Sequence, residues 1–345
     1  MNDIAEFCKS LKENYKPKKT NFTKPVSAWS EKDLLEKEVV DTFVIIFKTK
    51  GCSWALESGC SMCGYFNDSA FEDISGKDLL SQFENAMQKY NGERFVKIFT
   101  SGSFLDEKEI PVNVRKKILK KLYETADKVS VESRPEYITN ESLSKIKDLY
   151  KNKIFEIGIG LETADNFIRE KIINKGFTFD DYTKAADIMK KNNVKLKTYV
   201  LIKPPFLSEK QAIEDSLETV EKIKDITDIV SFNPVNVQRN TYVRYLWNRK
   251  MYRPPWLFSI IEILEKSKKI APNVRIKCDI VGGGNIRGAH NCRKCDKQFL
   301  KSISDFSLAQ DTKIFKNLKC NCSEKWHDQL EIEELGFGSH VNMYG

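Results

Sequence analysis

The stretch Phe-Val-Ile-Ile-Phe at residues 43–47, with the cysteine-rich loop at residues 50–65 after it, decides how the rest of this chain is interpreted. The apolar run is typical of a buried strand. The loop contains Cys52, Cys60 and Cys63. Three thiolates on one loop can hold three irons of a cubane cluster and leave the fourth iron open, because such clusters normally have a thiolate at every iron. The loop therefore predicts a catalytic [4Fe-4S] cluster, with structural zinc as the main alternative and a disulfide as a weaker one.

Length and composition indicate an ordinary globular protein. The chain has 345 residues, of which 41% are hydrophobic and 31% charged, enough for one barrel and a small appendage. No uninterrupted apolar segment approaches the roughly 18 residues of a membrane span, and the N-terminus lacks a signal-peptide core. We therefore expect a cytoplasmic protein with no membrane association. Eight of the nine cysteines fall in or near two clusters, which favours metal binding in a reducing compartment.

The charge balance favours an anionic partner. Lys and Arg total 57 against 49 Asp and Glu, which gives a net charge of +8. Nucleic acid is the first candidate for such a partner. The other interpretation is a Lys- and Glu-rich surface that serves solubility or stability at high temperature.

After the cysteine loop, strand-like and helix-like segments alternate. Strands are predicted at residues 95–99, 128–132, 154–161, 195–202 and 228–233. Helices between them are predicted to begin near Ser75, Pro111, Asn140, Thr178 and Ser208. Alternation of this kind predicts an α/β fold with a parallel sheet, either a barrel or an open doubly wound sheet.

Candidate functional residues follow the carboxyl ends of these strands, which favours the barrel. We expect a partial (βα)6 barrel at residues 41–275. A short N-terminal extension at residues 1–40 and a small cysteine-rich module at residues 276–345 complete the predicted organisation.

The three-cysteine loop resembles that of the radical S-adenosylmethionine (SAM) superfamily, with Met62 in the apolar position between the last two cysteines. The commonest spacing in that superfamily is C-x3-C-x2-C, whereas this chain has C-x7-C-x2-C. The four inserted residues are a departure that a loop can absorb but a helix could not. The resemblance implies a [4Fe-4S] cluster, SAM as the second cofactor, an external electron donor, and cleavage of SAM to a 5′-deoxyadenosyl radical.

The same resemblance implies SAM contacts at several strand ends. The small-residue turn at residues 100–104 matches the place where these enzymes receive the methionine amino group, although a plain turn is the alternative. The Glu-Ser-Arg-Pro stretch at residues 132–135 resembles the elongator-type tRNA-modifying members. The implied cofactor-binding residues are Ser101, Gly102, Ser103, Glu132, Ser133, Glu162 and Lys175. The sequence identifies no catalytic acid or base.

A second cysteine group lies near the C-terminus. Cys292 and Cys295 are followed, after 24 residues, by Cys320 and Cys322. Two short chelating turns of this kind can close a tetrahedral site, and the spacing favours structural zinc. A second iron–sulfur cluster or unliganded thiols are the alternatives.

Basic and aromatic side chains alternate through residues 238–256. Guanidinium groups neutralise phosphates and aromatic faces stack on unpaired bases, so this pattern predicts RNA binding. The candidate residues are Arg239, Arg244, Trp247, Arg249, Lys250 and Arg253. The alternative is an amphipathic helix that covers the barrel with its aromatic side.

Together, the widened cysteine loop, the strand ends Glu-Ser-Arg-Pro at residues 132–135 and Gly-Ile-Gly-Leu-Glu-Thr at residues 158–163, and the C-terminal cysteines resemble the archaeal radical SAM proteins of archaeosine formation. That family implies tRNA as the substrate, with a deazaguanine base that a partner subunit has joined to lysine, and cleavage of a carbon–nitrogen bond to leave archaeosine. Another RNA-modifying radical SAM enzyme of the elongator-related type is one alternative. A non-catalytic, zinc-stabilised RNA-binding protein is the other.

Overall fold

An eight-stranded sheet in the order β1-β2-β3-β4-β5-β6-β7-β8 forms the centre of the computed structural model, which describes residues 4–13, 15 and 21–335. The first two strands form an antiparallel hairpin, and all later neighbours are parallel. The strands are β1 (Ser27–Leu35), β2 (Glu38–Ile46), β3 (Phe95–Phe99), β4 (Lys128–Glu132), β5 (Ile154–Glu162), β6 (Lys195–Ile202), β7 (Ile229–Pro234) and β8 (Arg275–Cys278). The sheet curls into a partial barrel whose edge strands β1 and β8 are not paired with each other.

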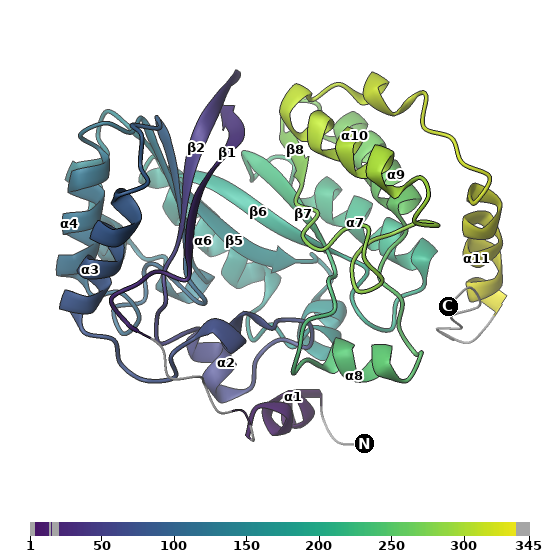
Figure 1. Ribbon diagram of the computed structural model, residues 1–345, viewed down its shortest axis with the longest axis horizontal. Helices are drawn as coiled ribbons and strands as arrows, with labels where there is room; N and C mark the ends of the chain where they lie inside the picture. Colours follow the sequence, from purple (N-terminus) through teal and green to yellow (C-terminus); the bar gives the residue numbers. More distant parts are fainter. Residues whose placement is uncertain (1–3, 14, 16–20, 336–345) are drawn as a thin grey trace.

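Helices cover the convex side of the sheet (Figure 1). The helices between the parallel strands are α3 (Gly76–Met87), α4 (Val112–Leu122), α5 (Asn140–Ser144), α6 (Phe179–Lys191), α7 (Glu209–Ile223) and α9 (Leu257–Ile270). Three others, α1 (Ile4–Glu13), α2 (Ser53–Glu57) and α8 (Tyr242–Asn248), lie together beyond the carboxyl ends of the strands. The C-terminal part contains α10 (Asp296–Ala309) and α11 (Ser323–Leu335). Single turns complete the chain: η1 (Tyr65–Asp68), η2 (Pro135–Tyr137), η3 (Lys147–Leu149), η4 (Ile168–Ile172) and η5 (Thr312–Phe315).

The predicted α/β partial barrel is confirmed, with β2 to β7 as its six expected parallel strands. Two further strands extend the sheet. β1 comes from the segment predicted as an extension, and β8 spans the predicted start of the cysteine-rich module at residue 276. Both edge strands of the sheet, β1 and β8, therefore contain residues from outside the segment 41–275 that was predicted as the barrel.

Local capping chemistry sets where the helices begin. The caps at Ser75, Thr178 and Ser208 are confirmed, each with its hydroxyl accepting a bond from the third helical residue. Two predicted starts were wrong by one residue. Thr139, not Asn140, caps α5, and Pro111 is the cap of α4 rather than its first helical residue. In the first case the Thr139 hydroxyl accepts the Ser142 backbone N–H at 3.0 Å while Ser142 bonds back to the Thr139 N–H, so the reciprocal pair begins the helix one residue earlier.

The concave side of the sheet is lined with paired charges. Glu156 of β5 is fully buried between Lys128 of β4 at 2.5 Å and Lys197 of β6 at 2.9 Å. Ser130 of β4 also donates to the Glu156 carboxylate, at 2.7 Å. Burial alone would raise the pKa of Glu156, but the two lysines lower it well below its usual range. The interior of the barrel is thus filled with ion pairs, and the open end lies at the carboxyl ends of the strands.

No helix in the described part of the chain is long and apolar enough to cross a membrane.

Candidate functional site

The cysteine loop leaves β2 and forms a short helix before it returns. Cys52 is the N-cap of α2, so the residues that widen the cysteine spacing make a helical turn instead of an irregular loop. Lys12 of α1 donates from Nζ to the carbonyls of Ala55 at 3.0 Å and Ser58 at 2.5 Å, which satisfies the carboxyl end of α2. On the other side, the Trp54 indole donates to the Asn174 carbonyl at 2.7 Å. The segment between Cys52 and Cys60 is therefore held in place by contacts on two sides.

The three thiols of this loop are free, half-buried and close enough to influence one another. Burial and the neighbouring Cys60 raise the pKa of Cys63 to about 12. A thiol with so high a pKa loses its proton readily only when a metal cation binds to the sulfur. Among the described residues, the sulfurs of Cys52, Cys60 and Cys63 are not grouped closely enough to bind one metal ion together. Half-buried, separated thiols on one loop fit a larger polynuclear group such as a cubane cluster, with Cys52, Cys60 and Cys63 as the residues that would hold it.

The predicted SAM-binding turn after β3 packs directly against this loop. A side chain at Gly102 would meet the Cys52 Cα at 2.7 Å and the Glu109 carboxylate. Only glycine permits so close an approach of the two loops. Ser103 is fully buried, and its hydroxyl accepts the Arg134 N–H at 3.0 Å, whereas Ser101 is half-buried and donates to the Tyr65 carbonyl at 3.3 Å. The turn therefore supports the cysteine loop through Gly102 and Ser101, whereas Ser103 bonds it to the end of β4.

Two of the predicted SAM-binding residues form an ion pair with each other. Lys175 Nζ lies 2.6 Å from the Glu162 carboxylate, and both side chains are mostly buried. Burial alone would lower the pKa of Lys175, but Glu162 outweighs it and raises the pKa. The pair crosses Gly160, where an added Cβ would meet the Lys175 ammonium at 2.7 Å. The backbone at Glu162 is left-handed (φ +70°), which is strained for a residue other than glycine. This backbone conformation fixes the direction in which the carboxylate leaves the chain.

A further group of polar side chains lies within β6 and at the ends of β4 and β8. Glu132 is half-buried beside Tyr199 of β6, whose hydroxyl bonds it, and burial raises the pKa of Glu132. Asp279, which follows β8, accepts the Ser231 hydroxyl at 3.0 Å and pairs with Lys277 at 3.2 Å. Sequence reasoning missed Tyr199, which lies within β6, and Asp279, which directly follows β8. The predicted residue Ser133 is buried, and its N–H bonds the Gly158 carbonyl at 3.0 Å.

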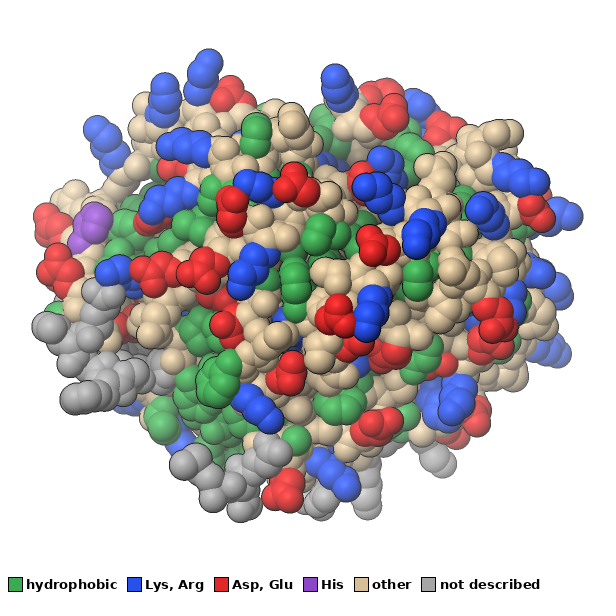
Figure 2. Space-filling model, turned by 180° about the vertical axis from the view of Figure 1, so that it is seen from behind, with side chains coloured by type: hydrophobic (Ala, Val, Ile, Leu, Met, Phe, Trp, Pro, Cys, Tyr) green, Lys and Arg blue, Asp and Glu red, His purple; other side chains and the backbone are tan. Residues whose placement is uncertain are grey.

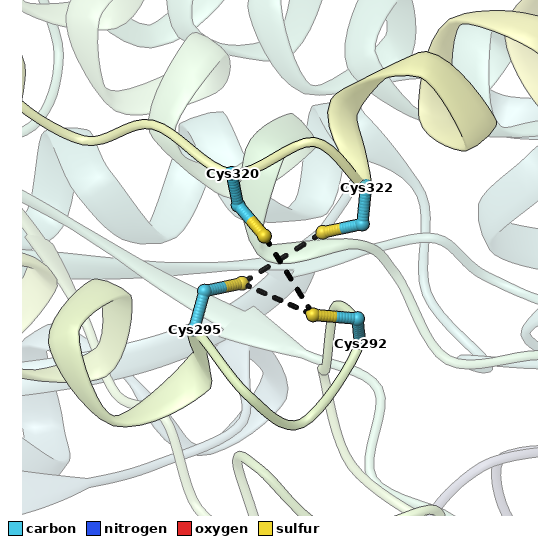
Figure 3. Close-up of side chains that lie close together, drawn as sticks. All are labelled: Cys292, Cys295, Cys320 and Cys322. Atoms are coloured by element: carbon cyan, nitrogen blue, oxygen red, sulfur yellow. Dashed lines mark hydrogen bonds between the residues drawn. The ribbon is translucent and has the colours of Figure 1, made fainter.

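The four C-terminal cysteines converge on one point (Figure 3). Their sulfurs lie 3.7 Å apart for Cys292 and Cys295, 3.7 Å for Cys292 and Cys320, and 3.8 Å for Cys295 and Cys322. Zn–S bonds of about 2.3 Å in a tetrahedron place sulfurs about 3.8 Å apart. Burial opposes ionisation of Cys292, but N–H groups of Cys295 and Lys294 outweigh it and lower its pKa to about 7. This geometry fits a single tetrahedral metal ion.

The basic aromatic segment forms α8 and the turns on either side of it. Arg239, Arg249 and Lys250 are exposed, and Arg244 and Trp247 are half-buried. Arg253 differs from these, because it is only 8% exposed and its guanidinium donates to the carbonyls of Pro254 and His290, both at 2.8 Å. Its position thus connects the barrel to the cysteine-rich module. The segment predicted to bind RNA as a unit is divided into an exposed part and a buried part.

Comparison with known proteins assigns the class of this fold and site. Residues 46–216 match the model of the Radical SAM superfamily, and the chain is an enzyme of that superfamily. It is 44% identical over 332 residues to "Archaeosine synthase subunit beta" of Methanosarcina acetivorans, which covers 94% of this chain and 95% of that protein. The protein of the same name from Thermococcus kodakarensis is 37% identical over 310 residues, covering 88% and 96%. The chain belongs to the archaeosine synthase subunit beta family.

Among solved structures, an archaeal Elp3 from Methanocaldococcus infernus with an N-terminal deletion matches with a TM-score of 0.47 and 19% sequence identity. The match covers 62% of this chain and 55% of that one. Membership of the superfamily implies SAM and a [4Fe-4S] cluster as cofactors. The three-thiol loop at the open end of the barrel fits that requirement.

Proposed function

We propose that this chain is the radical SAM enzyme of archaeosine formation, which cleaves a carbon–nitrogen bond in a lysine adduct of a deazaguanine base in tRNA. The observation that carries the proposal is the 44% identity to an archaeosine synthase subunit beta along nearly the whole chain, together with a three-thiol loop at the open end of the barrel. The word "subunit" in the relatives' name supports a partner protein, which in this proposal attaches the lysine.

When bound, the cluster and SAM supply a 5′-deoxyadenosyl radical, for which an external donor provides one electron. The chain's own residues hold and orient the reactants. Cys52, Cys60 and Cys63 would ligate three irons, and the neighbouring Glu162–Lys175 pair offers one charge of each sign to the amino and carboxylate groups of SAM. The surrounding barrel wall keeps the radical near one substrate C–H bond and away from water.

The substrate side of the site is proposed to lie between β6 and the ends of β4 and β8. Glu132, Tyr199 and Asp279 there present carboxylates and a hydroxyl beside the cysteine loop. These groups suit a substrate with amino and hydroxyl functions, such as the lysine and ribose parts of the adduct. The four-cysteine centre is proposed to hold structural zinc, because its sulfur spacing matches a single tetrahedral ion.

The test is anaerobic incubation of reconstituted protein with SAM, dithionite and lysine-adduct tRNA, followed by mass spectrometry of 5′-deoxyadenosine and of the digested nucleosides. We expect both 5′-deoxyadenosine and archaeosine, and both should disappear in Cys63→Ala. Deoxyadenosine without archaeosine would retain the radical enzyme and reject this substrate. Neither product from protein with a full complement of iron would reject the proposal altogether.

A further inference from the structure

Three arginines outside the cysteine site gather beside α8. Arg239 and Arg244 belong to the segment after β7, whereas Arg287 lies in the loop after β8. The Val237 N–H donates to the Arg287 carbonyl at 2.7 Å, and this backbone bond holds the two segments together. The guanidinium carbons of Arg244 and Arg287 both lie near the Trp247 ring, 5.0 and 5.6 Å from its centroid. One indole therefore positions two cations from distant parts of the chain.

The charge of this group is not neutralised by the protein. In the described part of the chain, no carboxylate lies within 4 Å of the guanidinium nitrogens of Arg239, Arg244 or Arg287. Burial, followed by the repulsion of Arg287 and Arg239, lowers the pKa of Arg244. Its Nη1 is enclosed and has no hydrogen-bond partner among the described residues. Like charges held together with an unused buried donor indicate that an anion belongs between them.

The rest of the charged surface is organised differently. Arg94, another exposed arginine, has carboxylate partners, Glu38 at 3.0 Å and Asp127 at 2.7 Å. Arg249 and Arg293 are exposed and form no ion pair among the described residues. The face shown in Figure 2 carries basic and acidic side chains interspersed. The group beside α8 is distinguished by three unpaired arginines gathered at one place.

The aromatic surroundings favour an RNA phosphate over a protein carboxylate. Arg249 stacks on Tyr245 at 3.6 Å from the ring centroid, next to the Arg244–Trp247 pair in the sequence, and both rings are half-buried. Guanidinium groups bind phosphates through paired hydrogen bonds, and the accessible parts of aromatic rings beside them can contact unpaired bases. A protein partner would more commonly meet a polar rim of mixed charge.

The segment that carries these arginines is also bonded to the cysteine loop. The Val243 N–H donates to the Ser61 carbonyl at 3.2 Å, and the Gly64 N–H donates to the Gln238 side chain at 2.5 Å. Both loop residues are adjacent to cysteines, Ser61 to Cys60 and Gly64 to Cys63. A phosphate bound at the arginines is consequently held at a fixed distance from the reaction site.

We propose that Arg239, Arg244 and Arg287 form a phosphodiester-binding site for the RNA substrate, with Trp247 as the residue that positions two of the three guanidiniums. The proposal rests on the proposed function only in taking RNA as the substrate. It assigns Arg287, which lies outside the basic aromatic segment, to the same surface, and it excludes the buried Arg253.

The experiment measures the affinity of reconstituted protein for transcribed tRNA by fluorescence anisotropy over a series of salt concentrations. We compare Arg287→Gln, Arg244→Gln and Arg239→Gln with Lys37→Gln, which removes one exposed charge from the turn between β1 and β2 at the opposite end of the sheet. Each arginine variant should weaken binding and lower the slope of log affinity against log salt by about 0.7–0.9, the value of one phosphate contact. Lys37→Gln should keep the parental slope.

A kinetic readout separates this site from the chemistry. The arginine variants should raise KM for tRNA several-fold while the formation of 5′-deoxyadenosine from SAM alone stays unchanged, and Arg244→Lys should recover part of the loss. Unchanged tRNA affinity and salt slope in all three variants would overturn the proposal. The proposal would also be overturned if the arginine variants no longer bound a partner protein while their tRNA affinity stayed unchanged. If the variants weaken tRNA binding but the parental enzyme forms no archaeosine, the phosphate site stands and the proposed reaction fails.

Discussion

Asp33 of β1 pairs with Arg275 of β8 across the one gap in the barrel where neighbouring strands share no backbone hydrogen bonds. The same carboxylate pairs with Lys97 of β3 and lies 3.5 Å from Lys277 of β8. Asp33 is only 4% exposed. A single buried acid thus contacts three cations, of which Lys97 and Lys277 have a second carboxylate partner in Glu31 and Asp279, and joins the two edges of the sheet through side chains.

Asp33→Asn should destabilise the protein by about 3–5 kcal/mol, because it leaves the mostly buried Arg275 without a carboxylate partner among the described residues and removes one partner each from Lys97 and Lys277. Urea unfolding followed by circular dichroism measures this loss. Asp41→Asn is the matched control, since Asp41 pairs with Lys32 on the surface of the same hairpin, where both side chains are more than half exposed. It should have little effect. Equal effects of the two substitutions would show that the edges do not depend on Asp33.

The same carboxylate predicts a pH dependence. Burial alone would raise the pKa of Asp33, but Lys277, Lys97 and Arg275 lower it far below its ordinary value. A depressed folded-state pKa contributes stability above the unfolded value of about 3.9, and that contribution is lost as the pH falls below it. The difference in unfolding free energy between the parent and Asp33→Asn should therefore stay constant from pH 7 to about 5 and narrow below about pH 4. A constant difference down to pH 3 would contradict this assignment.

Lys12 is expected to tune the cluster as well as support its loop. Its ammonium caps α2, and its electrostatic interactions reach the thiols of Cys52, Cys60 and Cys63. Lys12→Gln should lower the iron bound after reconstitution and make the reduction potential more negative, because a nearby cation favours the added electron. Potentiometric titration by electron paramagnetic resonance measures the second effect. Lys9→Gln on the exposed side of α1 is the control, and a potential equal to the parent's in Lys12→Gln would refute the role.

The Glu162–Lys175 pair allows a double-mutant cycle. Lys175→Met leaves a mostly buried carboxylate alone and should cost about 3–5 kcal/mol, whereas Glu162→Gln combined with Lys175→Met should recover much of that loss. Both variants should bind SAM more weakly in equilibrium dialysis. Lys184→Met, which removes an exposed pair with Asp180, should change neither quantity. Retained SAM affinity in the double variant would place the SAM contact elsewhere.

The two cysteine groups should lose their metals independently. Cys320→Ser should abolish bound zinc while iron is retained, because its sulfur is one of four that match a single tetrahedral ion. Cys60→Ala should do the reverse. Inductively coupled plasma mass spectrometry of anaerobically purified protein measures both metals. A loss of about four irons in Cys320→Ser would instead indicate a second cubane cluster.

Much of the barrel was predictable because its strands are short apolar runs separated by capped helices, and these signals act over a few residues. The strand β1 was not predicted, since Ser27–Leu35 shows no regular alternation and has three charged residues in a row, and its buried Asp33 is stable only beside basic residues of β3 and β8. Helix starts were wrong by one residue at Thr139 and Pro111, where neighbouring residues compete for the cap.

The candidate site was likewise predictable from the sequence only in part. Spacing along the chain was enough to group the four C-terminal cysteines, whose convergence on one point the structure confirms. It could not reveal that Lys12 caps a helix 43 residues away, that Glu162 and Lys175 pair with each other, or that Arg253 is buried while Arg287 belongs to the basic surface.

Periodicity, capping residues and cysteine spacing therefore predicted the class of fold, the order of its elements and the grouping of cysteines into two segments, because these depend on interactions between near neighbours in the chain. The tertiary structure alone decided which charges are paired among the described residues, which are not, and how the cysteine loop is supported. The physical reason is that the energy of a buried charge depends on partners from other strands and on exclusion of water, neither of which local sequence contains.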